Sequence, residues 1–367
     1  MRVLMISKAC IVGIYQRKLT AMVEVAPDLD LTVVVPPFWR DERGVTRLER
    51  VYTDGYRLEI QPLWFNGSFH MHFYPRLHSV IKHVKPDLVH IDEEPYNLAT
   101  YHANVLARRA GAKTLWFSWQ NLARQYPPPF SWIERYNLAH SDHALVGSQT
   151  AAKVWRAKGY AGGLGVIPQF GVDAQLFCPH ADRTTEAPVH IVYVGRLVPE
   201  KGCDLLLRAL TRVEGAWRAT VLGSGPEAPA LEASAVALGL EDRIVFRPWL
   251  PSAEMPGFYR TADVLVLPSR SQPNWTEQFG RVLIEAMASE VAVVGASAGE
   301  IPYVVGDAGW VFPEGDVDAL ADALTKLVVA PGLRSELGAQ GRARVLAAFT
   351  QERIAAATVA VYRELTA

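Results

Sequence analysis

The chain has 367 residues, half of them hydrophobic, and a formal net charge of −1. This length predicts two domains of about 150–200 residues each. Three cysteines without paired spacing argue against a disulfide framework and a zinc site, and no apolar run reaches the ~18 residues that a membrane span needs.

The charges are distributed unevenly. Residues 1–180 hold 20 Lys and Arg against 15 Asp and Glu, and the remainder holds 17 against 23. Nine of the ten histidines also lie in the first part. This basic first part is either an ordinary solvated surface or a surface that faces an anionic acceptor or a membrane.

The first half alternates buried strands with helices. Apolar runs predict strands at residues 3–6, 31–35, 87–92, 114–118, 144–148 and 165–168. His90 lies inside one strand, as a core residue or as an acid/base group, and Glu93, Gln120 and Asn121 follow strand ends. Residues 69–85 predict a basic amphipathic helix that either touches a membrane interface or packs against the core.

The second half begins after a linker predicted at residues 173–188. Apolar runs predict strands at 190–194, 219–222, 243–246, 263–267, 291–295 and 310–313, with final helices at 333–348 and 351–365. Strands that alternate with helices indicate parallel sheets, whose ligands bind beyond the carboxyl ends of the strands.

A phosphate site is predicted after the strand at 190–194. Gly195 and Arg196 follow it directly, and Lys201 lies at the start of the next helix. The helix dipole disfavours a cation there, and an anionic ligand would offset that cost. The glycine turn at Gly223 is a weaker signal of the same kind.

Two carboxylates flank a helix start in the stretch 268–302. Glu277 lies in a loop, and Glu285 lies inside a short apolar helix that follows Gly280. A glycine at a helix start lets a ligand approach the backbone N–H groups. Glu285 is either a ligand contact or a surface ion-pair partner of Arg281. A sugar nucleotide suits this pattern, with one glutamate for the ribose and one for the sugar hydroxyls.

Three segments resemble a known family. EQFGRVLIEAMA at residues 277–288 resembles the E-x7-E motif of family 4 of the retaining glycosyltransferases, GRLVPEKG at 195–202 resembles the family's diphosphate element, and QFGVD at 169–173 resembles its interdomain segment. The resemblance implies an α/β protein of the GT-B fold, with two Rossmann-like domains facing each other across a cleft. We expect these domains at residues 1–172 and 188–350, with a last helix at 351–367 packing back on the first.

The resemblance also implies a reaction. It is the transfer of a hexose, with retention of configuration, from a nucleoside-diphosphate sugar to a hydroxyl of a glycan or lipid-linked acceptor in cell-envelope synthesis. The resemblance also implies that no metal or other cofactor takes part and that the leaving diphosphate itself takes the acceptor's proton. The implied catalytic residues are Arg196, Lys201 and Glu277. The implied nucleotide-sugar contacts are Gly13, Gly195, Gly223, Arg247, Phe279, Gly280, Arg281, Val282 and Glu285.

The family's histidine near the end of the strand 114–118 has no counterpart here. Contacts to the acceptor or the donor sugar therefore fall to His90, Glu93, Gln120 and Asn121. We expect a cytoplasmic enzyme, either free or peripheral at the inner face of the membrane, without a nucleic-acid partner. An epimerase that uses His90 and Glu93, and a relative that only binds nucleotide sugars, are the alternatives. A nicotinamide-dependent enzyme is disfavoured because no strand leads into G-x-G-x-x-G.

Overall fold

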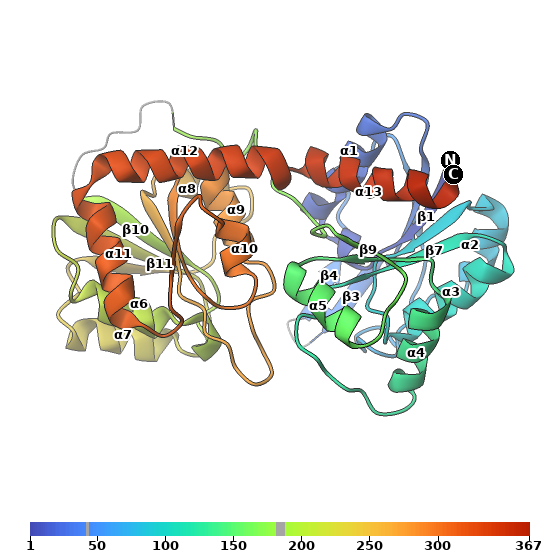
Figure 1. Cartoon of the computed structure of the whole chain (residues 1–367), viewed down its shortest axis with the longest axis horizontal. Helices are drawn as coiled ribbons and strands as arrows, with labels where there is room; N and C mark the ends of the chain where they lie inside the picture. The colour runs from blue at the N-terminus through green and yellow to red at the C-terminus, as the bar shows by residue number, and fades with distance from the viewer. Residues whose placement is uncertain (42–43, 181–187) are drawn as a thin grey trace. The chain divides into compact units, whose positions relative to one another are not determined.

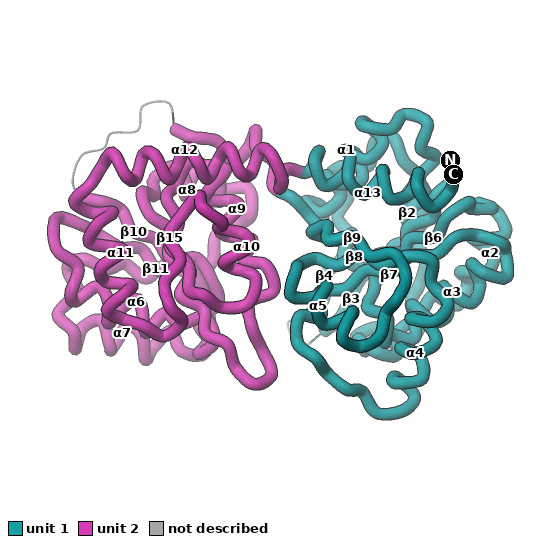
Figure 2. The backbone as a smooth tube through the Cα atoms, in the orientation of Figure 1, with its two compact units in different colours: residues 1–171, 351–367 teal, residues 172–350 magenta. Residues whose placement is uncertain are grey.

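We describe the molecule from a computed structural model, which covers residues 1–41, 44–180 and 188–367. The chain forms two compact units (Figure 2). Unit 1 contains residues 1–171 and 351–367, and unit 2 contains residues 172–350. Residues 181–187 of the predicted linker lie outside the described part.

Unit 1 is built on a parallel sheet with the strand order β5-β2-β1-β6-β7-β8-β9. Figure 1 shows the strands as arrows and the helices as coiled ribbons. Its strands are β1 Arg2–Ile6, β2 Asp30–Val35, β5 Arg57–Ile60, β6 Leu88–Ile91, β7 Lys113–Ser118, β8 His143–Val146 and β9 Gly163–Val166. Its helices are α1 Arg17–Val25, α2 Leu77–Val84, α3 Leu98–Arg109, α4 Phe130–His140, α5 Gln149–Ala157 and α13 Gln351–Thr366. A separate antiparallel hairpin joins β3 Phe38–Asp41 to β4 Gly44–Arg47.

Alternate residues of β1 face opposite sides of this sheet, as the two-residue period of a strand requires. Val3 and Met5 pack in a core that includes residues of α1 and α13, whereas Leu4 and Ile6 pack in a core with residues of α2 and α3. Helices therefore cover both faces, which explains why these strands are continuous apolar runs.

Unit 2 repeats this plan with the parallel strand order β12-β11-β10-β13-β14-β15. Its strands are β10 Val189–Val194, β11 Trp217–Leu222, β12 Ile244–Arg247, β13 Val264–Leu267, β14 Ala292–Ala296 and β15 Trp310–Phe312. Its helices are α6 Cys203–Leu210, α7 Ala228–Ala237, α8 Met255–Arg260, α9 Arg281–Ala288, α10 Ile301–Val305, α11 Val317–Val329 and α12 Pro331–Ala348.

The prediction of a helix over residues 69–85 is wrong for residues 69–76. Only α2 is helical there, and Phe73 instead pairs with Trp64 through an isolated antiparallel bridge. The apolar residues Leu77, Val80 and Ile81 of α2 are buried in the core of unit 1. Of the two interpretations of this segment, the structure therefore shows the core-packed one.

Candidate functional site

Glycines bring the strand-end loops of unit 2 together. A Cβ atom on Gly223 would lie 1.8 Å from the carbonyl oxygen of Gly195, so only glycine allows the loops after β10 and β11 to approach so closely. Gly202 has a φ of +66°, and a Cβ atom there would lie 2.0 Å from the carbonyl oxygen of Pro268. The loops that follow β10, β11 and β13 therefore lie close together at the carboxyl edge of the sheet.

Lys201 and Glu277 meet at this edge. Lys201 Nζ lies 2.5 Å from Glu277 Oε2, and Ser269 Oγ donates a hydrogen bond of 2.9 Å to the same carboxylate oxygen. The lysine ammonium also lies 5.0 Å from the centre of the Trp275 ring. Sequence reasoning assigned these two residues to different parts of a ligand, and the structure places them in direct contact.

The two other predicted cations are more exposed. The Arg196 side chain is 49% exposed and pairs with Glu200 at 3.3 Å. Arg247 ends β12 and is also exposed. Both side chains are therefore accessible to an anionic ligand from solvent.

Glu285 is buried, although it forms the ion pair expected of a surface residue. Its Oε1 lies 2.9 Å from Arg281 Nε, and Tyr259 donates its hydroxyl to Oε2 at 3.0 Å. Burial raises the pKa of Glu285, and the nearby Arg281 offsets part of that rise. The surface interpretation is wrong because only 9% of the residue is exposed.

Helix α9 begins next to this carboxylate. Gly280 precedes it with a φ of +80°, a left-handed conformation that favours glycine. Phe279 is buried and packs edge-on against Phe349, and Val282 in the first turn is half-buried. The dipole of a helix favours negative charge at its N-terminus, so this end is chemically suited to a phosphate.

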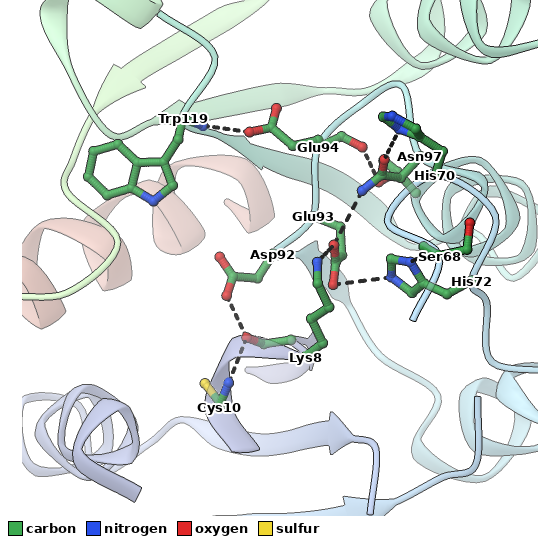
Figure 3. Close-up of polar contacts among 12 residues, drawn as sticks. Lys8, Cys10, Ser68, His70, His72, Asp92, Glu93, Glu94, Asn97 and Trp119 are labelled. Atoms are coloured by element: carbon green, nitrogen blue, oxygen red, sulfur yellow. Dashed lines mark hydrogen bonds and ion pairs between the residues drawn. The ribbon is translucent and has the colours of Figure 1, made fainter. Parts of the chain in front are cut away.

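A second polar cluster lies at the carboxyl edge of the unit 1 sheet (Figure 3). Ile6 of β1 pairs with Ile91 of β6, so the residues that follow each strand lie side by side. Lys8 Nζ lies 2.5 Å from Glu93 Oε2, and His72 Nε2 lies 3.5 Å from Glu93 Oε1. Burial alone would raise the pKa of Glu93, but Lys8 and His72 lower it to about 2.

Glu94 is held by the next strand. It accepts hydrogen bonds from Ser118 Oγ at 2.5 Å and from the Trp119 backbone N–H at 2.8 Å. Burial raises the pKa of Glu94 to about 7 in spite of these bonds. Gln120 is buried beside it and donates to the Leu122 carbonyl, while Asn121 is half-buried.

His90 and Gly13 were predicted to contact the ligands, and both form hydrogen bonds within unit 1. His90 is fully buried, and its Nδ1 shares a 2.5 Å hydrogen bond with the Tyr362 hydroxyl. Burial lowers the pKa of His90 well below its usual range. The prediction that it contacts a sugar is therefore wrong, because no part of the ring is accessible. The Gly13 N–H donates to the Glu49 carboxylate at 2.6 Å, so a ligand at that amide would have to displace Glu49.

Sequence reasoning did not assign a site role to Lys8, Tyr259 or Ser269. The signal for Lys8 was present, because it follows β1 by two positions as Glu93 follows β6, and neighbouring parallel strands bring such positions together. Tyr259 and Ser269 gave no comparable signal. Across residues 1–41, 44–180 and 188–367, no group of three or more His, Cys, Asp or Glu is arranged to hold a metal ion. No helix within those ranges is long and apolar enough to span a membrane.

Parts of the chain are similar to known proteins. Residues 188–329 match the family model described as "Glycosyl transferases group 1". A GDP-mannose-dependent alpha-(1-6)-phosphatidylinositol monomannoside mannosyltransferase of Mycolicibacterium smegmatis is 32% identical over 260 residues, covering 65% of this chain and 66% of the relative. The lipopolysaccharide core biosynthesis mannosyltransferase LpcC of Rhizobium leguminosarum is 35% identical, covering 54% and 59%. The chain thus spans less than two thirds of the length of these relatives.

Solved structures show the same fold over the whole chain. Sucrose-phosphate synthase from Thermosynechococcus elongatus superimposes with a TM-score of 0.74 at 22% identity, covering 100% of this chain and 99% of the synthase. Anabaena HepE in complex with UDP gives a TM-score of 0.75 at 17% identity, with both chains fully covered. The chain therefore has the GT-B fold of two Rossmann-like units, and residues 188–329 resemble group 1 glycosyl transferases.

Proposed function

We propose that the protein is a hexosyltransferase that takes its sugar from a nucleoside-diphosphate sugar and retains the anomeric configuration. The observation that carries this proposal is the edge of unit 2, where Lys201 pairs with Glu277, three residues before the N-cap Gly280 of α9, within the segment that matches group 1 glycosyl transferases. GDP-mannose is the proposed donor, because the relative from Mycolicibacterium smegmatis is named for it.

Each part of the donor has a proposed partner. The diphosphate binds Arg196, Lys201 and the N–H groups at the start of α9, which stabilise negative charge as it develops. Glu285 accepts hydrogen bonds from the ribose hydroxyls, and Glu277 accepts them from the sugar. Because Lys201 is paired with Glu277 in the structure, we propose that donor binding draws the ammonium toward the diphosphate.

The proposed transfer needs no metal ion. The acceptor oxygen forms a bond to the anomeric carbon, the bond from that carbon to the diphosphate breaks, and the acceptor proton passes to the diphosphate. Arg196 and Lys201 supply the positive charge that a divalent cation would otherwise bring. Activity is therefore expected to continue in the presence of a chelator.

The proposed acceptor is a hydroxyl of an envelope glycan or lipid-linked glycan, by analogy with the named relatives. We include peripheral contact with a membrane in the proposal. Trp64 and Phe65 of unit 1 are 60% and 58% exposed, and aromatic rings are favoured at membrane interfaces. Reduced binding of the double variant Trp64→Ala/Phe65→Ala to anionic vesicles would support this contact, and binding equal to that of the original protein would refute it.

The test of function is release of nucleoside diphosphate from GDP-mannose, with UDP-glucose as the comparison donor. Methyl α-mannoside serves as acceptor, and each reaction is run with and without EDTA. The proposal predicts acceptor-dependent GDP release, an α-linked product and no loss with EDTA. A strict need for manganese or magnesium would contradict the metal-independent mechanism.

The same experiment distinguishes a glycosyltransferase from an epimerase and from a protein that only binds nucleotide sugars. An epimerase would convert the nucleotide sugar without any acceptor. A relative that only binds nucleotide sugars would show affinity for the donor and no product with any acceptor.

A further inference from the structure

Lys201 lies in a short turn that needs support from other segments. Residues Pro199–Lys201 form one 3-10 turn, in which the Lys201 N–H donates to the Val198 carbonyl at 3.0 Å and the Gly202 N–H donates to the Pro199 carbonyl at 3.2 Å. Among the described residues, no side chain forms a capping hydrogen bond at the start of this turn or of α6, which follows it. Hydrogen bonds in such short turns have poor geometry, so bonds from outside have to fix the turn.

Arg270 supplies that support from the loop after β13. Its Nε and Nη2 donate to the Pro199 carbonyl at 3.2 and 2.7 Å, and its Nη2 and Nη1 donate to the two Asp204 carboxylate oxygens at 2.7 and 3.3 Å. Its backbone N–H also donates to the Glu200 carbonyl at 2.8 Å. One planar guanidinium therefore joins the 3-10 turn to the first turn of α6, a fork geometry that a lysine cannot reproduce.

The turn connects the two cations proposed for the diphosphate. Lys201 is its last residue, and its middle residue Glu200 pairs with Arg196 at 3.3 Å. The bonds to Pro199 and Asp204 use four of the five N–H donors of the Arg270 guanidinium, whose side chain is 28% exposed. We therefore expect Arg270 to act on a ligand through the turn.

We propose that Arg270 is a positioning residue, which holds the turn in the conformation that presents Lys201 and Arg196 to the donor's diphosphate. The proposal rests on the proposed nucleotide-sugar site and adds to it a residue that sequence analysis gave no role. Without the guanidinium, the Pro199 carbonyl loses two hydrogen bonds and the Lys201 ammonium loses its fixed place. The diphosphate then binds less tightly, whereas the nucleoside, which is assigned to Glu285, binds as before.

The test compares GDP with guanosine on the full chain. Dissociation constants for both are measured by ligand-observed NMR for the original protein and for Arg270→Ala, Arg270→Lys and Asp204→Asn. UDP and uridine take their place if the original protein binds UDP instead. Arg208→Ala is the matched control, because within the described part of the chain its guanidinium donates to Asp204, at 3.4 Å, and not to Pro199.

The proposal predicts that Arg270→Ala and Arg270→Lys weaken GDP binding by about tenfold, the lower end for one charge-assisted hydrogen bond, and leave guanosine binding unchanged. Asp204→Asn also weakens GDP binding, because the carboxylate holds the guanidinium in place. Arg208→Ala binds both ligands like the original protein. Amide hydrogen exchange, measured without ligand, is faster at Lys201 and Gly202 in both Arg270 variants, since the turn has lost its support.

Unchanged GDP affinity in Arg270→Ala would overturn the proposal. Full recovery in Arg270→Lys would show an effect of charge alone, and tighter GDP binding by Asp204→Asn would show that Arg270 binds the diphosphate directly; either result overturns the positioning role. Equal losses of GDP and guanosine affinity would show a general loss of structure and would overturn it too. If the original protein binds neither GDP nor UDP, the proposed function fails, and amide exchange at Lys201 and Gly202 still decides whether Arg270 holds the turn.

Discussion

Glu285 shows at the scale of one residue how burial changes the meaning of an ion pair. An exposed Arg–Glu pair four residues apart contributes less than about 1 kcal/mol, and its loss rarely affects anything else. Only 9% of Glu285 is exposed, and the side chains of Arg281 and Tyr259 both contact its carboxylate. Removing the carboxylate leaves Arg281 and Tyr259 without that partner.

Substitutions at the two site glutamates are expected to differ in effect. Glu285→Ala should weaken binding of both GDP and GDP-mannose by roughly 1.5–3 kcal/mol, the value of a charge-assisted hydrogen bond. Glu277→Ala should leave GDP affinity unchanged or slightly improved, because Lys201 loses its carboxylate partner, and should reduce turnover. Calorimetry with both ligands and a steady-state assay measure these effects. Equal losses of GDP affinity in the two variants would contradict the division of roles.

Glu94 should make the stability of unit 1 depend on pH. Its pKa is raised from 4.5 to about 7, so the native state keeps a proton that the unfolded chain releases above pH 4.5. The stabilisation is complete below pH 4.5 and is lost as the pH rises to about 7, by at most about 3 kcal/mol.

Glu94→Gln should remove this dependence, because glutamine resembles the protonated carboxyl and does not titrate. Urea unfolding of both proteins at pH 5 and pH 8 measures it. A difference in unfolding free energy between the two proteins that is the same at both pH values would show that Glu94 titrates normally.

At the scale of the secondary structure elements, local pattern predicted the buried strands well, because buried parallel strands are apolar runs bounded by turn residues. It missed the edge strand β5, whose residues are exposed or half-buried, and the hairpin of β3 and β4. It failed at residues 69–76, where Phe73 pairs with Trp64 and no local periodicity reveals that partner. It also missed the pairing of Lys8 with Glu93, which depends on β1 lying beside β6, and this neighbourhood is a property of the sheet order.

The sequence predicted the residues of the site around α9 but not their contacts. Glu277, Gly280 and Glu285 stood out because a glycine and two carboxylates interrupt an apolar pattern. The contacts of Glu285 with Tyr259, and of Glu277 with Ser269, join segments that are separate in the sequence, so no local pattern could predict them.

Gly202, in the loop that precedes α6, should not tolerate replacement by a residue with a side chain. Gly202 and Gly239 have nearly the same φ, +66° and +67°, but a Cβ atom on Gly202 would lie 2.0 Å from the Pro268 carbonyl oxygen, whereas one on Gly239 would have no atom within 4 Å. Gly239→Ala should cost about 1 kcal/mol of unfolding free energy from backbone strain alone. Gly202→Ala should cost at least ~2 kcal/mol more, because backbone must move. Denaturant unfolding compares them, and equal losses would contradict the predicted close contact.

At the scale of the whole molecule, two units share one architecture and present different chemistry at equivalent places. Each has a parallel sheet, and each gathers polar side chains beyond the carboxyl ends of its strands. Unit 2 offers Arg196, Lys201 and a helix start, which suit a diphosphate. Unit 1 offers a Lys8–Glu93 ion pair in which the carboxylate side chain is only 1% exposed.

The most direct test of the central claim is a calorimetric titration of the protein with GDP. We expect binding to the original protein, a loss of roughly 1.5–3 kcal/mol for Lys201→Ala, and no loss for Arg212→Ala, which removes an exposed arginine paired with Asp318. Unchanged affinity in Lys201→Ala, or no binding of GDP, UDP or their sugars by the original protein, would contradict a nucleotide-sugar site in unit 2.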